Sequence, residues 1–116
     1  MDKAFIKNSN TRDFASEEWD RLCARNSSEL AIAEIDREIS VGELIEKVRM
    51  RAGQFIAQGA APGSRVIVAR PNVIEIVIDY LAVRLCGAVF VNLPWSSGTS
   101  ITELAEILDA KVVVLT

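Results

Sequence analysis

Histidine is absent from this chain of 116 residues, and cysteine occurs only twice. Without histidine the protein lacks the commonest general base and a principal zinc ligand. Cys23 and Cys86 are too few to build a zinc site by themselves. We predict that both are free, buried thiols rather than a disulfide, because nothing in the sequence marks the chain for secretion. The sequence therefore predicts no metal-binding residue.

Long apolar runs and concentrations of positive charge are missing as well. The longest apolar run, residues 73–83, is broken by Glu75 and Asp79 and is far short of the roughly 20 residues that span a bilayer. Residues 1–8 lack the apolar stretch and cleavage site of a signal peptide. A formal net charge of -3 gives no electrostatic reason to bind nucleic acid. We expect a cytoplasmic protein with no membrane span and no nucleic-acid partner.

What is present is the composition of a globular protein, in which half of the residues are apolar and a quarter are charged. The length corresponds to one small domain or to part of one. We interpret residues 1–11 as a flexible lead-in, because they are polar and unpatterned, and residues 12–116 as one partial α/β subdomain. Near its start, Ser16 is placed to cap a short helix. Residues 30–35 and 38–40 then predict a small β-hairpin.

Two segments carry a helix-capping pattern. Ser40 and Glu43 form a capping box, with serine and glutamate three residues apart, directly before a run with helical periodicity. The apolar face of that run comprises Leu44, Ile45, Val48, Ala52, Phe55 and Ile56. Gly59 supplies its C-terminal stop. The same spacing recurs at Ser100 and Glu103 and predicts another helix there.

Continuous apolar strands alternate with helices in the second half of the chain. The expected strands are residues 65–69, 88–93 and 111–115, and the helices between them are residues 72–86 and 100–108. Strands without polar alternation, separated by helices, indicate a parallel sheet covered on both faces. The predicted fold class is therefore α/β, with an N-terminal helix and a small β-hairpin followed by a βαβαβ parallel-sheet unit.

The helix predicted for residues 72–86 is apolar nearly all round, interrupted only by Glu75, Asp79 and Arg84. Such a helix is normally buried on most sides, and a domain of this size can hardly bury it fully. We therefore expect self-association, through this helix or through an exposed sheet edge. The three charged residues are more typical of a solvated stripe or a partner-facing pair than of catalysis.

Several positions have both a functional and a structural interpretation. Residues 96–100 are rich in serine, glycine and threonine, as phosphate loops are, but they lack a lysine and lead into a helix, which favours a plain connector and N-cap. Asn72 lies where doubly wound sheets bind ligands, although an asparagine there more often caps a helix. Gly63 favours a turn, and Gly87 favours a helix C-cap. Trp95 either lines a pocket or covers the sheet edge.

The chain contains no Walker loop, dinucleotide fingerprint or nucleophile elbow, so the sequence assigns no catalytic and no cofactor-binding residue.

Four segments match one family pattern in order. They read ISVGEL at residues 39–44, GAAPGSRV at 59–66, RPNVIE at 70–75 and YLAVRLCGAVFV at 80–91. From about Ala31 onward the chain resembles the N-terminal part of the AMP-forming adenylating enzymes, which include acyl- and aryl-CoA ligases, luciferase and the adenylation domains of peptide synthetases. The resemblance implies that these segments are structural framework within a larger N-terminal domain. Family members often carry an acidic residue where this chain has Ser64, and residues 95–99 match no subgroup, so no acyl substrate is assigned.

The resemblance implies a function for a parent enzyme rather than for these residues. In the family, a carboxylate attacks the α-phosphate of Mg-ATP to give an acyl-adenylate and pyrophosphate, and coenzyme A then takes the acyl group as a thioester. The motifs that handle ATP lie beyond Thr116 in the family pattern. ATP, Mg2+ and coenzyme A are therefore implied for the parent enzyme, the remainder of its own polypeptide is the implied partner, and this fragment alone is expected to bind none of them and to be inactive.

Two alternatives belong to other classes. In the first, the chain is a free-standing small α/β binding or interaction module without catalysis. In the second, it is a fragment that docks on a separate partner chain. The reading frame after Thr116 distinguishes these alternatives from the ligase. A frame that continues into a serine-, threonine- and glycine-rich loop ending in proline, lysine and glycine supports the ligase, and a stop codon supports the module.

Overall fold

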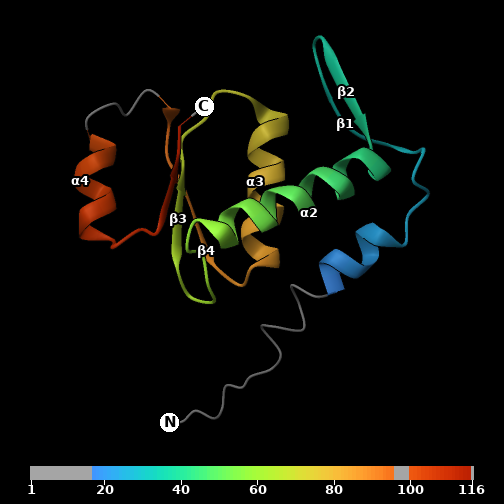
Figure 1. Cartoon of the computed structure of the whole chain (residues 1–116). Helices are drawn as coiled ribbons and strands as arrows, with labels where there is room; N and C mark the ends of the chain where they lie inside the picture. The colour runs from blue at the N-terminus through green and yellow to red at the C-terminus, as the bar shows by residue number, and fades with distance from the viewer. Residues whose placement is uncertain (1–16, 96–99, 116) are drawn as a thin grey trace.

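The computed structural model describes residues 17–95 and 100–115 and has an α/β fold (Figure 1). Residues 17–23 are helical, as the sequence predicts. The arginine Arg49 lies over the ring of Trp19 at 5.7 Å, which helps to hold this helix against the body of the molecule. The segment interpreted as a lead-in, residues 1–11, lies outside the described residues.

A small antiparallel hairpin follows and projects from the rest of the molecule (Figure 1). Its strands are β1 (Leu30–Glu34) and β2 (Arg37–Ser40), with an irregularity in the register between Leu30 and Ile32. The hairpin is confirmed, with its turn at residues 35–36, one residue earlier than the sequence pattern indicated.

The long helix α2 (Val41–Ala57) begins at the predicted capping box. The backbone N–H of Glu43 donates to the hydroxyl of Ser40 at 3.2 Å, and the N–H of Ser40 donates to the carboxylate of Glu43 at 3.0 Å. Two backbone donors that the first turn would leave unpaired are thereby satisfied. The residues that α2 buries are Val41, Leu44, Val48, Ala52 and Phe55.

The second half of the chain forms the predicted βαβαβ unit. Its strands β3 (Arg65–Val68), β4 (Val89–Asn92) and β5 (Val112–Val114) are parallel and lie in the order β4-β3-β5. Helix α3 (Val73–Leu85) connects β3 to β4, and α4 (Ser100–Ile107) connects β4 to β5. Helices α2 and α3 lie on one face of the sheet and α4 lies on the other (Figure 1). The predicted fold class is confirmed.

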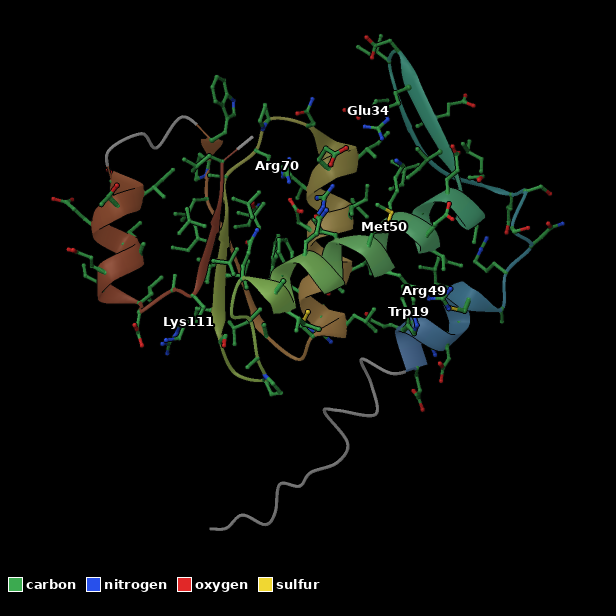
Figure 2. All side chains as sticks on the ribbon, viewed as in Figure 1. Trp19, Glu34, Arg49, Met50, Arg70 and Lys111 are labelled. Atoms are coloured by element: carbon green, nitrogen blue, oxygen red, sulfur yellow. The ribbon has the colours of Figure 1, made fainter. Side chains whose placement is uncertain are left out.

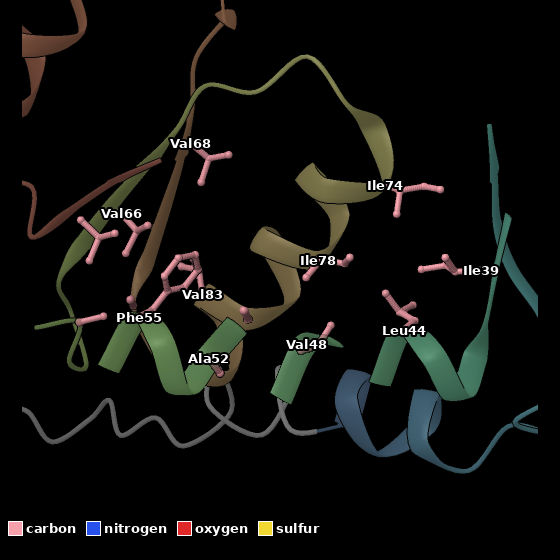
Figure 3. Close-up of a cluster of buried hydrophobic side chains, with 14 residues drawn as sticks. Ile39, Leu44, Val48, Ala52, Phe55, Val66, Val68, Ile74, Ile78 and Val83 are labelled. Atoms are coloured by element: carbon pink, nitrogen blue, oxygen red, sulfur yellow. The ribbon is translucent and has the colours of Figure 1, made fainter. Parts of the chain in front are cut away.

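Alternation along β3 divides the core between the two faces of the sheet. Val66 and Val68 join the large cluster under α2 and α3, which also contains Ile74 and Ile78 (Figure 3). Ile67 belongs to a smaller cluster on the α4 side. The central strand is thus buried on both sides, which explains why its sequence is apolar without alternation.

Two glycines hold the turns at the amino end of the sheet. Gly63 has a φ of 85° and Gly87 a φ of 76°, in the left-handed region that side chains other than glycine rarely adopt. The N–H of Gly63 donates to the carbonyl of Gly87 at 3.0 Å, which ties the turn before β3 to the C-terminal end of α3. The structural interpretation of both glycines is confirmed.

The cysteines differ in part from the prediction. Cys23 and Cys86 are both free, as expected, but Cys23 is exposed rather than buried. Cys86 is half-buried, its thiol donates to the carbonyl of Ala52 at 3.6 Å, and burial raises the pKa of this thiol. Cys23 is the last residue of a helix whose other face, with Trp19 and Leu22, packs on the core, so the prediction that this thiol is buried was wrong.

Helix α3 packs between α2 and β4 and also contacts β1. Its buried residues include Ile74, Ile78, Ala82 and Val83, while Val73 and Leu85 at its ends are exposed. The chain's own elements therefore cover one long side of this apolar helix. Among the described residues, no helix has the length and apolar character needed to cross a membrane.

Candidate functional site

The carboxyl ends of the parallel strands meet at one edge of the sheet, where ligands bind in open α/β folds. Arg70 lies just beyond β3, Trp95 beyond β4 and Leu115 beyond β5. Trp95 is 60% exposed and so neither lines a closed pocket nor is itself covered. Of the serine-rich segment, residues 96–99 lie outside the described residues, and Ser100 is the first residue of α4.

Near this edge five charged side chains form one network, which we call the arginine–carboxylate cluster. Its members are Arg37, Arg51, Arg70, Glu75 and Asp79. Asp79 is fully buried on α3. Its carboxylate accepts hydrogen bonds from Nη1 of Arg51 on α2 and from Nε of Arg70, the latter at 2.6 Å. A buried carboxylate is tolerated here because two guanidiniums compensate its charge.

Glu75 is the second carboxylate of the cluster and lies one turn before Asp79 on α3. It accepts from Nη2 of Arg51 at 2.8 Å and from Nη1 of Arg37 at 3.0 Å. The hydrogen bond from Arg51 lowers the pKa of Glu75, an effect that partial burial opposes and the contact with Arg37 reinforces. Burial alone would lower the pKa of Arg51, but its bonds to both carboxylates outweigh burial and raise that pKa.

The cluster is a structural clamp rather than a set of catalytic groups. It joins β2, α2, α3 and the segment after β3, and both of its carboxylates are held by guanidiniums. A general base needs a lone pair within reach of a substrate proton, and Asp79 has no exposed surface. The prediction of a solvated stripe was therefore wrong for Asp79. It was wrong because periodicity along one helix does not show the arginines that other elements bring to it.

Arg84 does not belong to this cluster, although the sequence grouped it with Glu75 and Asp79. Its guanidinium lies 3.7 Å from the carboxylate of Glu18 and 5.8 Å from the centre of the Tyr80 ring. Arg84 is thus near the C-terminal end of α3, where a positive charge is favoured by the helix dipole.

Asn72 occupies the N-cap position of α3, as predicted, but its side chain makes no capping hydrogen bond. The carboxylate of Glu34, at the end of β1, instead accepts from the backbone N–H of Ile74 at 3.4 Å. The hairpin therefore supplies the acceptor for the first turn of α3. Figure 2 shows Glu34 near the turn of the hairpin, on the side that faces the start of α3.

A hollow of about 460 Å3 lies between α2 and the C-terminal part of β5. Its lining residues are Arg51, Gln54, Phe55, Gln58, Arg70, Val113, Val114 and Leu115. Two guanidiniums of the cluster thus reach this hollow, and no carboxylate lines it. Within residues 17–95 and 100–115, no group of three or more histidine, cysteine, aspartate or glutamate side chains is arranged to hold a metal ion.

Comparison with known proteins gives a consistent result at the level of structure. No family model matches the chain, and no curated protein matches its sequence. The N-terminal subdomain of Klebsiella oxytoca NpsA is similar, with 23% identity, a TM-score of 0.71, and coverage of 84% of this chain and 26% of that one. The N-terminal domain of FACL13 from Mycobacterium tuberculosis has 20% identity and a TM-score of 0.74, with coverage of 85% and 26%.

A benzoate CoA ligase from Burkholderia xenovorans LB400 is also similar, with 20% identity and a TM-score of 0.75, over 86% of this chain and 20% of that one. The chain therefore spans between a fifth and about a quarter of the length of these structures. Identities this low establish the fold. The chain shares the fold of part of the adenylation domains and CoA ligases, as the resemblance in its sequence implies.

Proposed function

We propose that the chain is the N-terminal structural part of an ATP-dependent acid–thiol ligase, which forms an acyl-adenylate and then an acyl-CoA thioester. The observation that carries this proposal is the structural likeness over 82–86% of the chain to proteins described as CoA ligase, as ATP-bound MatB and as an adenylation di-domain. The sequence pattern points to the same enzymes independently of the structure.

The role of these residues in such an enzyme is positional. The capping box at Ser40 and Glu43 starts α2, and Gly63 and Gly87 fix the turns that lead into β3 and β4. The arginine–carboxylate cluster then fastens α2 to α3. Each motif that carries the family resemblance thus has a structural task in the fold, which supports a framework role over a catalytic one.

The described residues do not fit ATP with Mg2+. Glu75 and Asp79 are the carboxylates of the cluster near the carboxyl edge of the sheet, and arginines already bind both. The described part of the chain contains no lysine near the ends of β3 or β4. We therefore assign ATP, Mg2+ and coenzyme A to parts of the parent enzyme outside these 116 residues, and we propose that the chain alone catalyses neither step.

The test begins with the natural reading frame beyond codon 116. The polypeptide that it encodes is incubated with ATP, Mg2+, coenzyme A and a panel of fatty, aryl and alicyclic acids, and products are followed by mass spectrometry. We expect AMP, pyrophosphate and a CoA thioester with at least one acid. The 116-residue chain is the control and gives none of these products.

Two outcomes would contradict the proposal. A stop codon directly after Thr116 in the natural gene, or a longer folded polypeptide that forms neither adenylate nor thioester with any acid, would favour the free-standing binding module. The matched readout for that alternative is ligand binding by the chain alone, since a module without catalysis still has to bind something.

A further inference from the structure

The sheet ends at β5, which pairs with β3 alone among the described strands. The carbonyl of Val114 accepts from the N–H of Ala69 at 2.8 Å, so it points toward β3. Backbone groups alternate in direction along a strand, and those of Val113 and Leu115 therefore point outward. The side chains of Val113 and Leu115 are 40% and 50% exposed. An exposed apolar edge of this kind is a template for another strand.

The hollow described above lies beside this edge and is positive in character. The arginine–carboxylate cluster has three guanidiniums and two carboxylates, which leaves one positive charge without an opposite charge inside the cluster. Arg51 and Arg70 line the hollow, together with the side-chain amides of Gln54 and Gln58. Every polar side chain that lines the hollow is thus able to donate a hydrogen bond, and none of the lining side chains is acidic.

The guanidinium of Arg70 has N–H groups that the cluster does not use. It donates to Asp79 from Nε at 2.6 Å and, more weakly, from Nη2 at 3.5 Å. Among the described residues, its Nη1 has no acceptor. A guanidinium carries five N–H groups in a planar fork that matches a carboxylate. A carboxylate that enters the hollow would therefore meet both uncompensated charge and unused donors.

We propose that the outer edge of β5 binds an extended segment that adds a further strand to the sheet and directs one acidic side chain into the hollow, toward Arg70. The segment belongs to the same polypeptide and lies outside these 116 residues. This assignment of the segment rests on the proposed function. Backbone hydrogen bonds along β5 supply the affinity, and the carboxylate in the hollow supplies the selectivity.

The same charges oppose a second copy of this chain at that edge. If two β5 strands paired antiparallel about Val113, Lys111 of one copy would lie opposite Leu115 of the other. Leu115 adjoins the hollow that Arg51 and Arg70 line. The pairing would thus bring an ammonium group to a site with excess positive charge, and like charges across an interface are unfavourable. The outer edge of β5 therefore favours an acidic strand over the β5 strand of a second copy.

The test uses the 15N-labelled chain and two capped peptides of about seven residues, the length of a short strand. Both alternate threonine and valine, and they differ only in a central glutamate or glutamine. We expect the glutamate peptide to shift the amide signals of Val113 and Leu115 in a saturable manner. The glutamine peptide binds at least about fivefold more weakly, because it lacks the charge that the guanidiniums attract.

Two variants with the same change in net charge locate the effect. Gln58→Glu places a carboxylate in the hollow without altering the arginine–carboxylate cluster, and we expect it to weaken the glutamate peptide at least about fivefold while leaving the glutamine peptide unchanged. Lys111→Gln removes a positive charge at the opposite end of β5 (Figure 2). We expect it to change the affinity of the glutamate peptide by less than about twofold, because Lys111 does not line the hollow.

The source of the segment is tested in the longer polypeptide by amide hydrogen exchange. We expect the amide of Val113 to be protected there and to exchange freely in the 116-residue chain. Unshifted signals at Val113, equal affinities of the two peptides, equal effects of the two variants, or an unprotected Val113 in the longer polypeptide would each overturn the inference. None of these readouts uses ATP or a thioester, so they fail or succeed independently of the ligase assay.

Discussion

The two faces of the sheet are packed to different extents. The face under α2 and α3 carries the large buried cluster shown in Figure 3. The fully buried Asp79, which is paired with Arg51 and Arg70, also lies on α3. The face under α4 has a smaller buried cluster of Ile67, Ala69 and Ile101. On that side Ile107 is largely exposed. The comparison indicates that the α2–α3 face determines the stability of the chain, while the α4 face contributes less.

The largest expected effect is the loss of Asp79. Asp79→Ala leaves Arg51 and Arg70 partly buried without their shared carboxylate, and breaking a buried ion pair in this way costs about 3–5 kcal/mol. We expect the free energy of unfolding, measured by urea titration, to fall by that amount or the chain not to fold. Glu106→Ala, at an exposed acidic residue of α4 outside its first turn, is the control and changes this free energy by less than about 0.5 kcal/mol. Equal effects of the two variants would refute the comparison.

A pair of isoleucine truncations compares the two faces directly. Ile78 is fully buried in the large cluster, and Ile101 is the buried residue of α4. Ile78→Ala leaves a cavity in a well-covered core and should cost about 3–5 kcal/mol. Ile101→Ala should cost about 1–2 kcal/mol less, because a thinly covered site can collapse or hydrate more readily. Unfolding free energies in which Ile101→Ala is the more damaging variant would reverse our view of the faces.

The capping box at the start of α2 has a smaller expected effect. Ser40→Ala removes the acceptor for the N–H of Glu43, and the loss of a serine N-cap costs about 1 kcal/mol. Ser28→Ala is the matched control, since the hydroxyl of Ser28 is exposed and bonds only to the nearby side chain of Asn26. Thermal unfolding should show a lower midpoint for Ser40→Ala and almost no change in the midpoint for Ser28→Ala. A midpoint equal to that of the unchanged chain would exclude the cap as a stabilising contact.

Acidification tests the second carboxylate of the clamp. The pKa of Glu75 is lower in the folded chain than its ordinary value of 4.5, so this carboxyl binds protons more weakly when the chain is folded. Its contribution to stability is fully present above pH 4.5 and is lost as the pH falls below that value and through the lower, folded pKa. Glu75→Gln should therefore reduce the loss of stability between about pH 5 and pH 3. An identical pH dependence in both proteins would show that Glu75 does not contribute.

Much of the fold could be predicted from the sequence because its signals are local. The capping box at Ser40, the glycines at 63 and 87, and the unbroken apolar strands each depend on a few adjacent residues, and each has the expected structure. The cluster around Asp79 could not be predicted in the same way. Its five charges come from four separate segments, and no period or spacing relates Arg51 on α2 to Arg70 after β3.

The partial failure at Asp79 still left a signal in the sequence. An aspartate flanked by apolar residues on a nearly continuous apolar helix has to find a positive partner, because an unpaired buried charge is too costly. That rule predicts an arginine or lysine near Asp79 without saying which one. The exposed position of Cys23 has no such signal, since a cysteine near a helix end is compatible with either environment.

The most direct test of the central claim is carboxylate-dependent exchange of pyrophosphate into ATP, measured for the 116-residue chain and for the longer polypeptide of its natural gene. The claim is that these residues are the framework of an adenylate-forming enzyme and hold none of its chemistry. It predicts exchange by the longer polypeptide with at least one acid, and none by the chain alone at any concentration. Exchange that persists in the highly purified 116-residue chain, or that is absent from the folded longer polypeptide with every acid, would contradict it.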